Sequence, residues 1–320
     1  MAKKQVTFAD IAEYTGFSKT TISRYFNHPD SLTLENQEKI AKALDELGYR
    51  KNKLARVLAN GKSEFVGIIV PNLYLHYYSE MLTQLLRSYS DYHYKFLVFV
   101  SDGGPEKEMQ LLDELMAYKI EGLIVLSHTL SSEKLASYNI PVIAIEREAE
   151  HICSVTTDNY MGSMQATSLL IRNQCDVLIH INVHVPENIP AYDRIRAFEE
   201  TCREYHVPYE LNLNVSGDSY QELFEQMRVI FQDIDSKYSG QKKGIFLSND
   251  TYANIFLNLI FQKYNCLPDE YQIIGFDNSP IAAESIIPIT TIGQQIDVIA
   301  QTTMELLVEQ MNEMKKRKPA

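Results

Sequence analysis

The sequence has few cysteines, no long hydrophobic run and no recognisable export signal. Its four cysteines form neither a closely spaced metal-binding pair nor a disulfide framework, so we expect reduced thiols. The longest apolar runs, such as residues 96–100 and 122–126, fall far short of the ~20 residues that cross a bilayer. The N-terminal residues contain no apolar signal segment. These absences predict a cytoplasmic protein without a membrane span.

The commonest catalytic signatures are also missing. The sequence contains no Gly-x-Ser-x-Gly nucleophile elbow, no Gly-x-x-x-x-Gly-Lys phosphate loop and no Gly-x-Gly-x-x-Gly dinucleotide turn. His180 and His184 have the spacing of a helical metal-binding pair, but the run 177–185 is typical of a strand, in which they would stand ~13 Å apart. We therefore expect a protein that is not an enzyme and that holds no metal or cofactor.

The composition is that of an ordinary globular protein, and 320 residues predict two or three domains. The formal charge of −12 is unevenly distributed. Residues 1–63 contain 11 Lys and Arg against 7 Asp and Glu, whereas the remaining residues contain 19 against 35. Such asymmetry is expected of a small nucleic-acid-binding head on an acidic body, and ordinary surface chemistry explains it as well.

Residues 7–48 have the pattern of three short helices. A capping box precedes a first helix at about residues 8–14, Gly16 suits a tight turn, and Ser18 is a good N-cap for a second helix. A third helix spans about residues 33–48. Because apolar residues recur at helical spacing in each segment, the three helices can close a small core.

A helix, a glycine-containing turn and a helix form a helix-turn-helix, whose second helix presents its N-terminal part to base edges in the major groove. The outer face of this helix carries small polar and cationic side chains, including Lys19 and Arg24, and such cations contact guanine well. Phosphate contacts are expected from Thr7, Ser18, Thr21, Ser23, Asn27 and Ser31. A solvated helical hairpin in an unrelated domain is the alternative.

Residues 52–63 have the pattern of one short helix with a stop at Gly61, and a helix of this length is marginal in water without a partner. Its apolar stripe includes Leu58, which suits pairing with a second copy or insertion between base steps in a minor groove. We expect a hinge helix here, and a flexible linker is the alternative.

The run VTFADIAEYTGFSKTTISRYFN at residues 6–27 resembles the DNA-binding signature of the LacI/GalR family of bacterial transcription regulators. The runs LDELGY and ARVLANGKS further along are similar to that family's third helix and hinge helix. One departure is the family's Tyr-x-Pro-Asn junction, which here is Tyr-Arg-Lys-Asn and lacks the proline that many members have. A looser junction weakens hinge ordering.

This resemblance implies specific DNA contacts. It assigns base reading to Lys19, Thr20 and Arg24. It also makes Leu58 the minor-groove wedge, with Ala55 beside it. The partner implied is therefore double-stranded operator DNA.

From residue 65 onward, short apolar runs alternate with amphipathic helical stretches. The runs suit buried parallel strands and lie at 65–70, 96–100, 122–126, 142–145, 177–182, 244–247 and 273–276. Such alternation predicts α/β layers, and the length suits two doubly wound lobes. Because ligands of such sheets bind beyond the carboxyl ends of the strands, a cleft between the lobes is expected.

This region is similar to the effector domain of the same family, which resembles periplasmic sugar-binding proteins. The matching pieces are VGIIVP, PVIAIER, TDNYMG, RIRAF, LSND, IGFD and PITTI. By position, the resemblance implies that Arg147, Arg194, Asn249 and Asp277 face the effector. Glu146 stands where the family usually has Asp.

The chemistry of these residues suits a polyol, because carboxylates, amides and guanidinium groups pair with neighbouring hydroxyls. Tyr74, Tyr77 and Tyr78 follow the first body strand, where the resemblance places an aromatic ring against the sugar, and simple helix packing is the alternative. Two arginines in the cleft would equally suit an acidic sugar or a sugar phosphate. The identity of the carbohydrate effector stays open.

The predicted fold is an N-terminal all-α helix-turn-helix head with a hinge helix, followed by an α/β body of two doubly wound parallel-sheet lobes, similar to periplasmic binding proteins. The expected boundaries are 1–51 for the head, 52–63 for the hinge and linker, and 64–320 for the effector-binding and dimerisation body. One lobe would comprise about 64–159 and 290–320, and the other about 160–289.

The predicted function is a repressor of a carbohydrate-utilisation operon that binds DNA as a homodimer. No heptad extension follows the last helix, so we expect a dimer rather than a tetramer. Two alternatives stay open. The regulator could answer to a phosphocarrier protein, as some family members do, or the cleft could belong to a sugar-processing enzyme.

Overall fold

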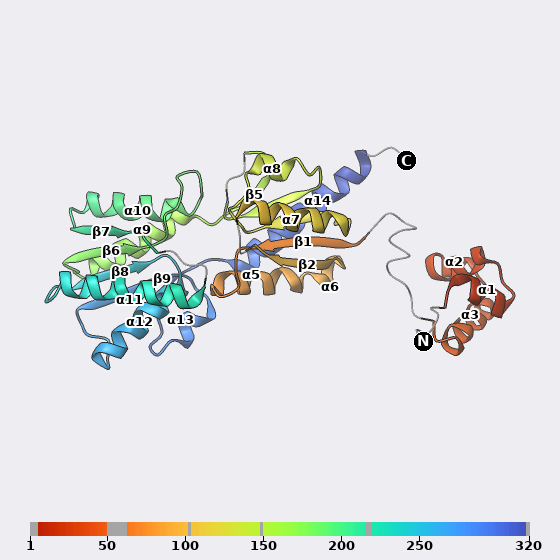
Figure 1. The fold of residues 1–320 in the computed structure, drawn as a ribbon, viewed down its shortest axis with the longest axis horizontal. Coiled ribbons are helices and arrows are strands. Elements are labelled where there is room, and N and C mark those ends of the chain that lie inside the picture. The colour runs from red at the N-terminus through yellow and green to blue at the C-terminus, as the bar shows by residue number, and fades with distance from the viewer. Residues whose placement is uncertain (1–5, 50–62, 102–103, 148–149, 216–218, 318–320) are drawn as a thin grey trace. The chain divides into compact units, whose positions relative to one another are not determined.

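The computed structural model describes residues 6–49, 63–101, 104–147, 150–215 and 219–317 (Figure 1). The chain divides into two compact units, Met1–Lys62 and Ser63–Ala320. The residues predicted to enter the minor groove, Ala55 and Leu58, lie outside the described residues.

The first unit packs its helices around a small apolar core. It contains α1 (Phe8–Thr15), α2 (Lys19–Asn27), the 3-10 turn η1 (Pro29–Ser31) and α3 (Leu34–Glu46). Ile11, Ile22 and Ile40 each come from a different helix and are completely buried. The rings of Phe8 and Phe26 stack over this core with centroids 5.2 Å apart. The predicted arrangement of three short helices is confirmed.

Side-chain caps fix where these helices begin. Thr7 and Asp10 form both halves of a capping box at α1, and Gly16 ends that helix with a φ of 74°, which glycine adopts without strain. The Ser18 hydroxyl accepts a hydrogen bond from the Thr21 amide, 3.1 Å away, and so starts α2 immediately after the turn. The helix-turn-helix geometry therefore follows from local sequence.

The second unit contains two five-stranded parallel sheets. The first has the order β2-β1-β3-β4-β5, and its strands are β1 (Phe65–Val70), β2 (Lys95–Val100), β3 (Gly122–Val125), β4 (Val142–Ile145) and β5 (Cys153–Val155). The second has the order β10-β9-β8-β6-β7, with β6 (Val177–Ile181), β7 (Tyr209–Asn212), β8 (Lys243–Leu247), β9 (Tyr271–Asp277) and β10 (Thr290–Gly293). The two parallel-sheet lobes are confirmed.

Helices cover both sheets (Figure 1). Those between β1 and β5 are α5 (His76–Arg87), α6 (Tyr89–Tyr92), α7 (Pro105–Ala117) and α8 (Ser132–Ala136). The second lobe has α9 (Asn159–Arg172), α10 (Tyr192–Glu204), α11 (Tyr220–Lys237), α12 (Asp250–Tyr264) and α13 (Pro280–Glu284). The last helix, α14 (Ile296–Arg317), returns to the first lobe, where Met304 and Leu307 are buried beside β1 and β3 residues.

The chain therefore crosses from the first lobe to the second between β5 and α9, and returns between β10 and α14. β10 pairs with β9, so residues 290–293 belong to the second sheet, and the return crossing follows Gly293. The lobe limits expected near residues 159 and 290 remain approximate predictions.

Three strands were not predicted, namely β5, β7 and β10. Each lies at the edge of its sheet and is only partly buried. An edge strand needs fewer apolar residues than a central one, so its sequence lacks the continuous apolar run that marks a buried strand.

Gly275 in β9 provides a test of this packing. A Cβ atom at this position would lie 2.3 Å from Oδ1 of the completely buried Asp250. We expect Gly275→Ala to destabilise the second unit by about 1–3 kcal/mol, the usual cost of overpacking. Gly104→Ala is the matched control, because no atom of the described residues lies within 4 Å of its added methyl group. Urea unfolding followed by circular dichroism measures both, and equal midpoints would contradict the packing described.

Candidate functional site

The second helix of the head presents a polar surface. Lys19, Thr20 and Arg24 of α2 are exposed, whereas Ile22 of the same helix is buried. Thr20 and Arg24 are one helical turn apart and therefore share a face. This face has the hydroxyl and cationic groups that contact base edges. The base contacts themselves stay a prediction.

The side chains predicted to contact phosphates lie at the N-caps of α1 and α2, within α2, or in η1, and they are Thr7, Ser18, Thr21, Ser23, Asn27 and Ser31. Several of them also hold one another in place. The hydroxyls of Ser18 and Thr21 are 2.9 Å apart, and Nδ2 of Asn27 donates to the Ser23 hydroxyl over 3.2 Å. Thr7 and Ser18 cap the N-termini of α1 and α2, so both lie beside backbone N–H groups that also favour phosphate.

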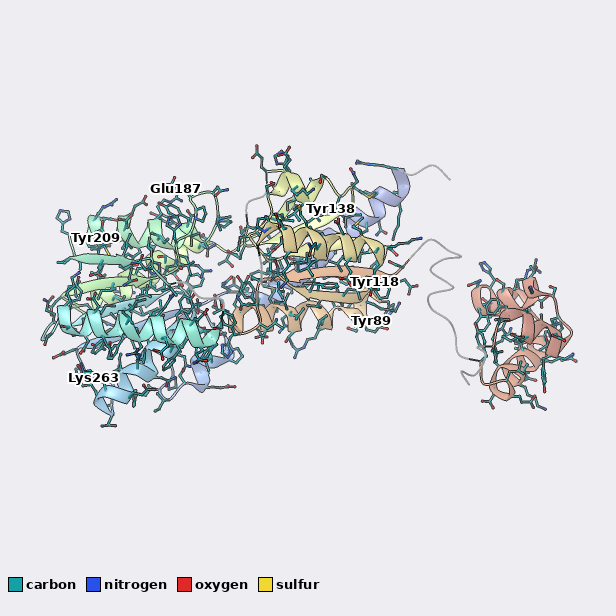
Figure 2. All side chains as sticks on the ribbon, viewed as in Figure 1. Tyr89, Tyr118, Tyr138, Glu187, Tyr209 and Lys263 are labelled. Carbon is teal, nitrogen blue, oxygen red and sulfur yellow. The ribbon has the colours of Figure 1, made fainter. Side chains whose placement is uncertain are left out.

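The second unit contains a cavity of about 400 Å³ at the carboxyl ends of strands from both sheets. Ligands of parallel α/β sheets bind at this edge. Six of the seven predicted effector residues line it: Tyr74, Tyr77, Tyr78, Arg194, Asn249 and Asp277. Much of the remaining wall comes from the loop after β6, on which Glu187 is labelled in Figure 2.

Arg147 is the predicted effector residue that does not line the cavity. It follows β4 and is buried, and its two terminal nitrogens donate to the backbone carbonyls of Ser127 and Leu130. Its guanidinium group therefore supports the loop after β3. A contact between Arg147 and an effector stays a prediction.

Arg194, at the start of α10, joins three elements of the second lobe. Its Nε donates to Oδ1 of Asn159, and its Nη1 donates to the backbone carbonyl of Ser248, each over 2.7 Å. The guanidinium carbon lies 3.7 Å from the centre of the Phe276 ring, a close cation–π contact. These contacts fix the buried guanidinium group at the wall of the cavity.

The contacts of Arg194 continue into the first lobe through Asn159. Nδ2 of Asn159 donates to Oε2 of Glu146 over 2.8 Å, and the other oxygen of Glu146 accepts from the Thr157 backbone amide. Glu146 follows β4 of the first sheet, whereas Asn159 begins α9. The hydrogen bonds from Arg194 through Asn159 to Glu146 therefore span the outward crossing between the lobes.

A second branch reaches the return crossing. The Thr157 hydroxyl donates to Oε1 of Gln294 over 2.6 Å, and Nε2 of Gln294 donates to Oδ1 of Asp277 over 2.7 Å. Gln294 lies between β10 and α14, where the chain returns to the first lobe. The crossing network, defined as Arg194, Asn159, Glu146, Thr157, Gln294 and Asp277, thus links both crossings to the cavity wall.

The carboxyl group of Asp277 is the most perturbed acid of this network. Burial raises its pKa to about 8, the positive charge of Arg194 opposes that rise, and the negative charge of Asp250 adds to it. Asp277 also has a φ of 110°, which is rare for a residue with a side chain. Strained backbone and a perturbed acid together are typical of a functional site.

The three predicted tyrosines both pack and line the cavity. Tyr74 contacts the hydrophobic cluster of the second lobe, whereas Tyr77 and Tyr78 contact that of the first. Burial raises the pKa of both Tyr77 and Tyr78, so they stay protonated donors. The Tyr77 hydroxyl is buried and has no hydrogen-bond partner among the described residues. It is therefore available to a ligand.

Other cavity residues escaped the sequence analysis, notably His128, Asn182, His184 and Gln294. Three of them follow β3 or β6, so their place just beyond a strand was the available signal. Burial and the charge of Arg147 lower the pKa of His128 to about 4, which leaves it neutral. His180 lies inside β6, completely buried, and burial lowers its pKa to about 3.

Among the described residues, no cluster of three or more His, Cys, Asp or Glu side chains could hold a metal ion. Within the same residues, every helix is too short or too polar to span a membrane.

A helix-turn-helix unit joined to a two-lobed unit with a cavity defines a ligand-responsive DNA-binding regulator. Residues 7–52 match the model of bacterial regulatory proteins of the lacI family, residues 63–195 match the periplasmic binding proteins and sugar binding domain of that family, and residues 170–320 match a periplasmic binding protein-like domain. The chain belongs to the LacI family of transcriptional regulators.

Individual relatives cover nearly the whole chain. The sucrose operon repressor of Streptococcus mutans is 30% identical over 95% of this chain and 92% of its own length. The ribose operon repressor of Halalkalibacterium halodurans is 28% identical over 95% and 90%. The crystal structure of the lac repressor dimer bound to operator and an anti-inducer has a TM-score of 0.81 at 21% identity, covering 97% of this chain and 94% of that one. The predicted family and fold class are confirmed.

Asp277 should give the folded chain a measurable pH dependence. Its pKa of about 8 exceeds the ~3.9 of an unfolded aspartate, so between these values the folded state binds the extra proton. Stability should therefore fall as the pH rises through this window, by at most ~1.4 kcal/mol per pH unit from this group. Asp277→Asn keeps an oxygen for Gln294 but cannot ionise.

Urea unfolding of both proteins at about pH 5 and about pH 7.5 measures the difference. We expect the variant to lose less stability on going to the higher pH than the unsubstituted protein. Parallel losses in the two proteins would show that Asp277 is ionised throughout.

Proposed function

We propose that this regulator represses a carbohydrate-utilisation operon and that a sugar bound in the cavity sets its affinity for operator DNA. One observation carries the proposal: tyrosine, carboxyl, amide and guanidinium groups from both lobes line one cavity. This combination suits a polyol, since polar groups pair with hydroxyls while aromatic rings cover the apolar face. The names of the sucrose and ribose operon repressors support a sugar.

The crossing network is the proposed route from cavity to DNA. Asp277 and Arg194 line the cavity and also bond to groups at both lobe crossings. A sugar that contacts them changes the preferred angle between the lobes, and with it the separation of two hinge segments in a homodimer. Coupling between two sites in one protein is typically ~1–3 kcal/mol.

The residue roles follow the sequence analysis. Lys19, Thr20 and Arg24 are proposed to read bases, and Ala55 and Leu58 to enter the minor groove. The effector residues proposed are Tyr74, Tyr77, Tyr78, Arg194, Asn249 and Asp277. A direct role for Arg147 requires that its guanidinium group leave the Ser127 and Leu130 carbonyls.

We also propose a cytoplasmic homodimer, because its DNA partner lies in that compartment and a pseudo-palindromic operator matches a two-fold protein. The test has two steps. First, the full chain selects operator sequences from a random DNA pool, and its affinity is measured at several salt concentrations. Then the preferred operator is titrated with protein in the presence of sucrose, ribose, fructose or glucose.

We expect at least one sugar to change operator affinity about 5- to 150-fold. A response to a phosphocarrier protein in the absence of sugar would favour that alternative regulator. Chemical conversion of a sugar would favour an enzyme. If no DNA sequence is preferred over the random pool, the proposal fails.

Arg24→Ala should remove sequence discrimination by the head. Arg24 is exposed on α2, and one good side-chain contact to a base contributes ~1–3 kcal/mol of discrimination. We expect about 5- to 150-fold weaker binding to the selected operator, with sugar binding unchanged. Lys42→Ala is the matched control, because Lys42 is an exposed cation of the same unit on α3. Gel-shift titrations measure both variants, and equal losses in the two would mean that Arg24 contributes charge alone.

A further inference from the structure

We infer that Asp250 is a positioning residue of the effector site, which clamps the loop after β9 so that the carboxyl group of Asp277 faces the cavity. The inference rests on the proposed function, since it takes the cavity as the effector site. Asp250 itself is not among the described residues that line the cavity, whereas Asp277 is. Asp250 therefore acts through another residue and not by touching the effector.

The burial of Asp250 is not explained by the helix that it begins. Asn249 caps α12, since its side chain accepts from the Tyr252 amide over 2.9 Å. An acid in the first turn suits the helix dipole without being buried. Asp250 is nevertheless completely buried, which is costly for a carboxyl group unless it has hydrogen-bond donors. Its donors lie on the loop after β9 and on β10.

These donors tie down two successive peptide units of the loop. Oδ2 of Asp250 accepts from the Ser279 amide over 2.7 Å and from the Ser279 hydroxyl over 3.1 Å. Oδ1 of Asp250 accepts from the Thr291 hydroxyl over 2.5 Å, and that hydroxyl accepts from the Asn278 amide over 3.3 Å. The two backbone amides that follow Asp277 are thus held by one carboxyl group, one of them directly and the other through Thr291.

The clamped loop has a backbone that needs such support. Asp277 has a φ of 110° and Asn278 has a φ of 54°, and positive values are uncommon for residues other than glycine. Backbone of this kind persists only where the surrounding contacts enforce it. The bonds to Asp250 supply that enforcement, because a rotation at Asp277 would pull the next two amides away from their acceptors. The same rotation would turn the Asp277 carboxyl group away from its present direction.

Strands β9 and β10 are both adapted to receive this carboxyl group at one level of the sheet. Gly275 of β9 pairs with Thr291 of β10, whose hydroxyl donates to Asp250. A Cβ atom at Gly275 would lie 2.3 Å from Oδ1 of Asp250, so a side chain there would displace the acid. The close approach of Asp250 to the sheet therefore depends on glycine at this position.

Asp250 and Gln294 hold Asp277 in different ways. Gln294 donates to Asp277 through its backbone amide over 3.3 Å and through Nε2 over 2.7 Å, and it lies on the return crossing. The bonds of Asp250 stay within α12, the loop after β9 and β10, all of which belong to the second lobe. Asp250 therefore keeps Asp277 fixed to its own lobe when an effector competes for the bond to Gln294.

Substitutions of Asp250 in the full chain test this role. Isothermal titration calorimetry with sucrose, ribose, fructose and glucose measures affinity, and urea unfolding measures stability. We expect Asp250→Ala to weaken binding of the preferred sugar about 10- to 100-fold, because a contact group is misplaced. Asp250→Asn should restore most of that affinity, since its oxygen can accept from Ser279 and its amide can donate to Thr291.

Asp235→Ala is the matched control, because Asp235 is a second buried acid of the same lobe. It accepts from the Tyr264 and Tyr271 hydroxyls and from Lys263, and it is not among the described lining residues. Both alanine variants should lose stability, but Asp235→Ala should change sugar affinity by less than ~2-fold. Equal affinities in the two variants would mean that Asp250 only stabilises the fold, and the inference would be overturned.

Thr291→Val tests the clamp without a sugar and without a change of charge. It keeps the Asp250 carboxyl group but breaks the link to the Asn278 amide. Asp277 should then reach water, so its pKa should fall below about 8. The loss of stability between about pH 5 and about pH 7.5 should become smaller than in the unsubstituted protein. An unchanged loss means that the loop keeps Asp277 in place without the clamp, which overturns the inference.

The outcomes separate this inference from the proposed function. Specific operator binding, with sugar binding weakened in Asp250→Ala but not in Asp235→Ala, supports both. If none of the four sugars binds, the sugar effector fails, and the unfolding of Thr291→Val decides the role of Asp250 by itself. Loss of specific DNA binding overturns the proposed function and leaves the measurements on Asp250 valid.

Discussion

The crossing network is the constraint on which the second unit depends. It joins buried polar groups at the two places where the chain passes between the lobes, and its members are Arg194, Asn159, Glu146, Thr157, Gln294 and Asp277. A buried polar group is costly when it is unpaired, so each bond in such a network holds its neighbours to one geometry. A change in the angle between the lobes must therefore break or replace bonds at the cavity wall.

Much of the fold was predictable because its signals are local. Thr7, Gly16 and Ser18 cap or end their helices within four residues, and central strands such as β1 consist of apolar residues buried on both faces. The edge strands β5, β7 and β10 were missed for a physical reason. They are held by pairing with a neighbouring strand, which is a long-range interaction, so their own composition carries little signal.

The candidate site was predictable in its position and less so in its orientation. A residue at the end of a parallel strand or just beyond it must lie at the carboxyl edge of the sheet, which places Asp277 and Asn249 without knowledge of their contacts. The direction of Arg147 depends instead on the carbonyls of Ser127 and Leu130, which another strand connection brings close. No local pattern encodes the hydrogen bonds between Arg147 and these distant carbonyls. These bonds decide that Arg194, and not Arg147, lines the cavity.

Fixing the arginines by protein oxygen atoms has a consequence for regulation. The Arg194 side chain has little freedom, since it is held by Asn159 and Ser248 and stacks on Phe276. A ligand that replaces the hydrogen bond between Asp277 and Gln294 must then shift Gln294, which lies on the return crossing. Contact with the effector and its effect on the lobes are thus set by the same residues.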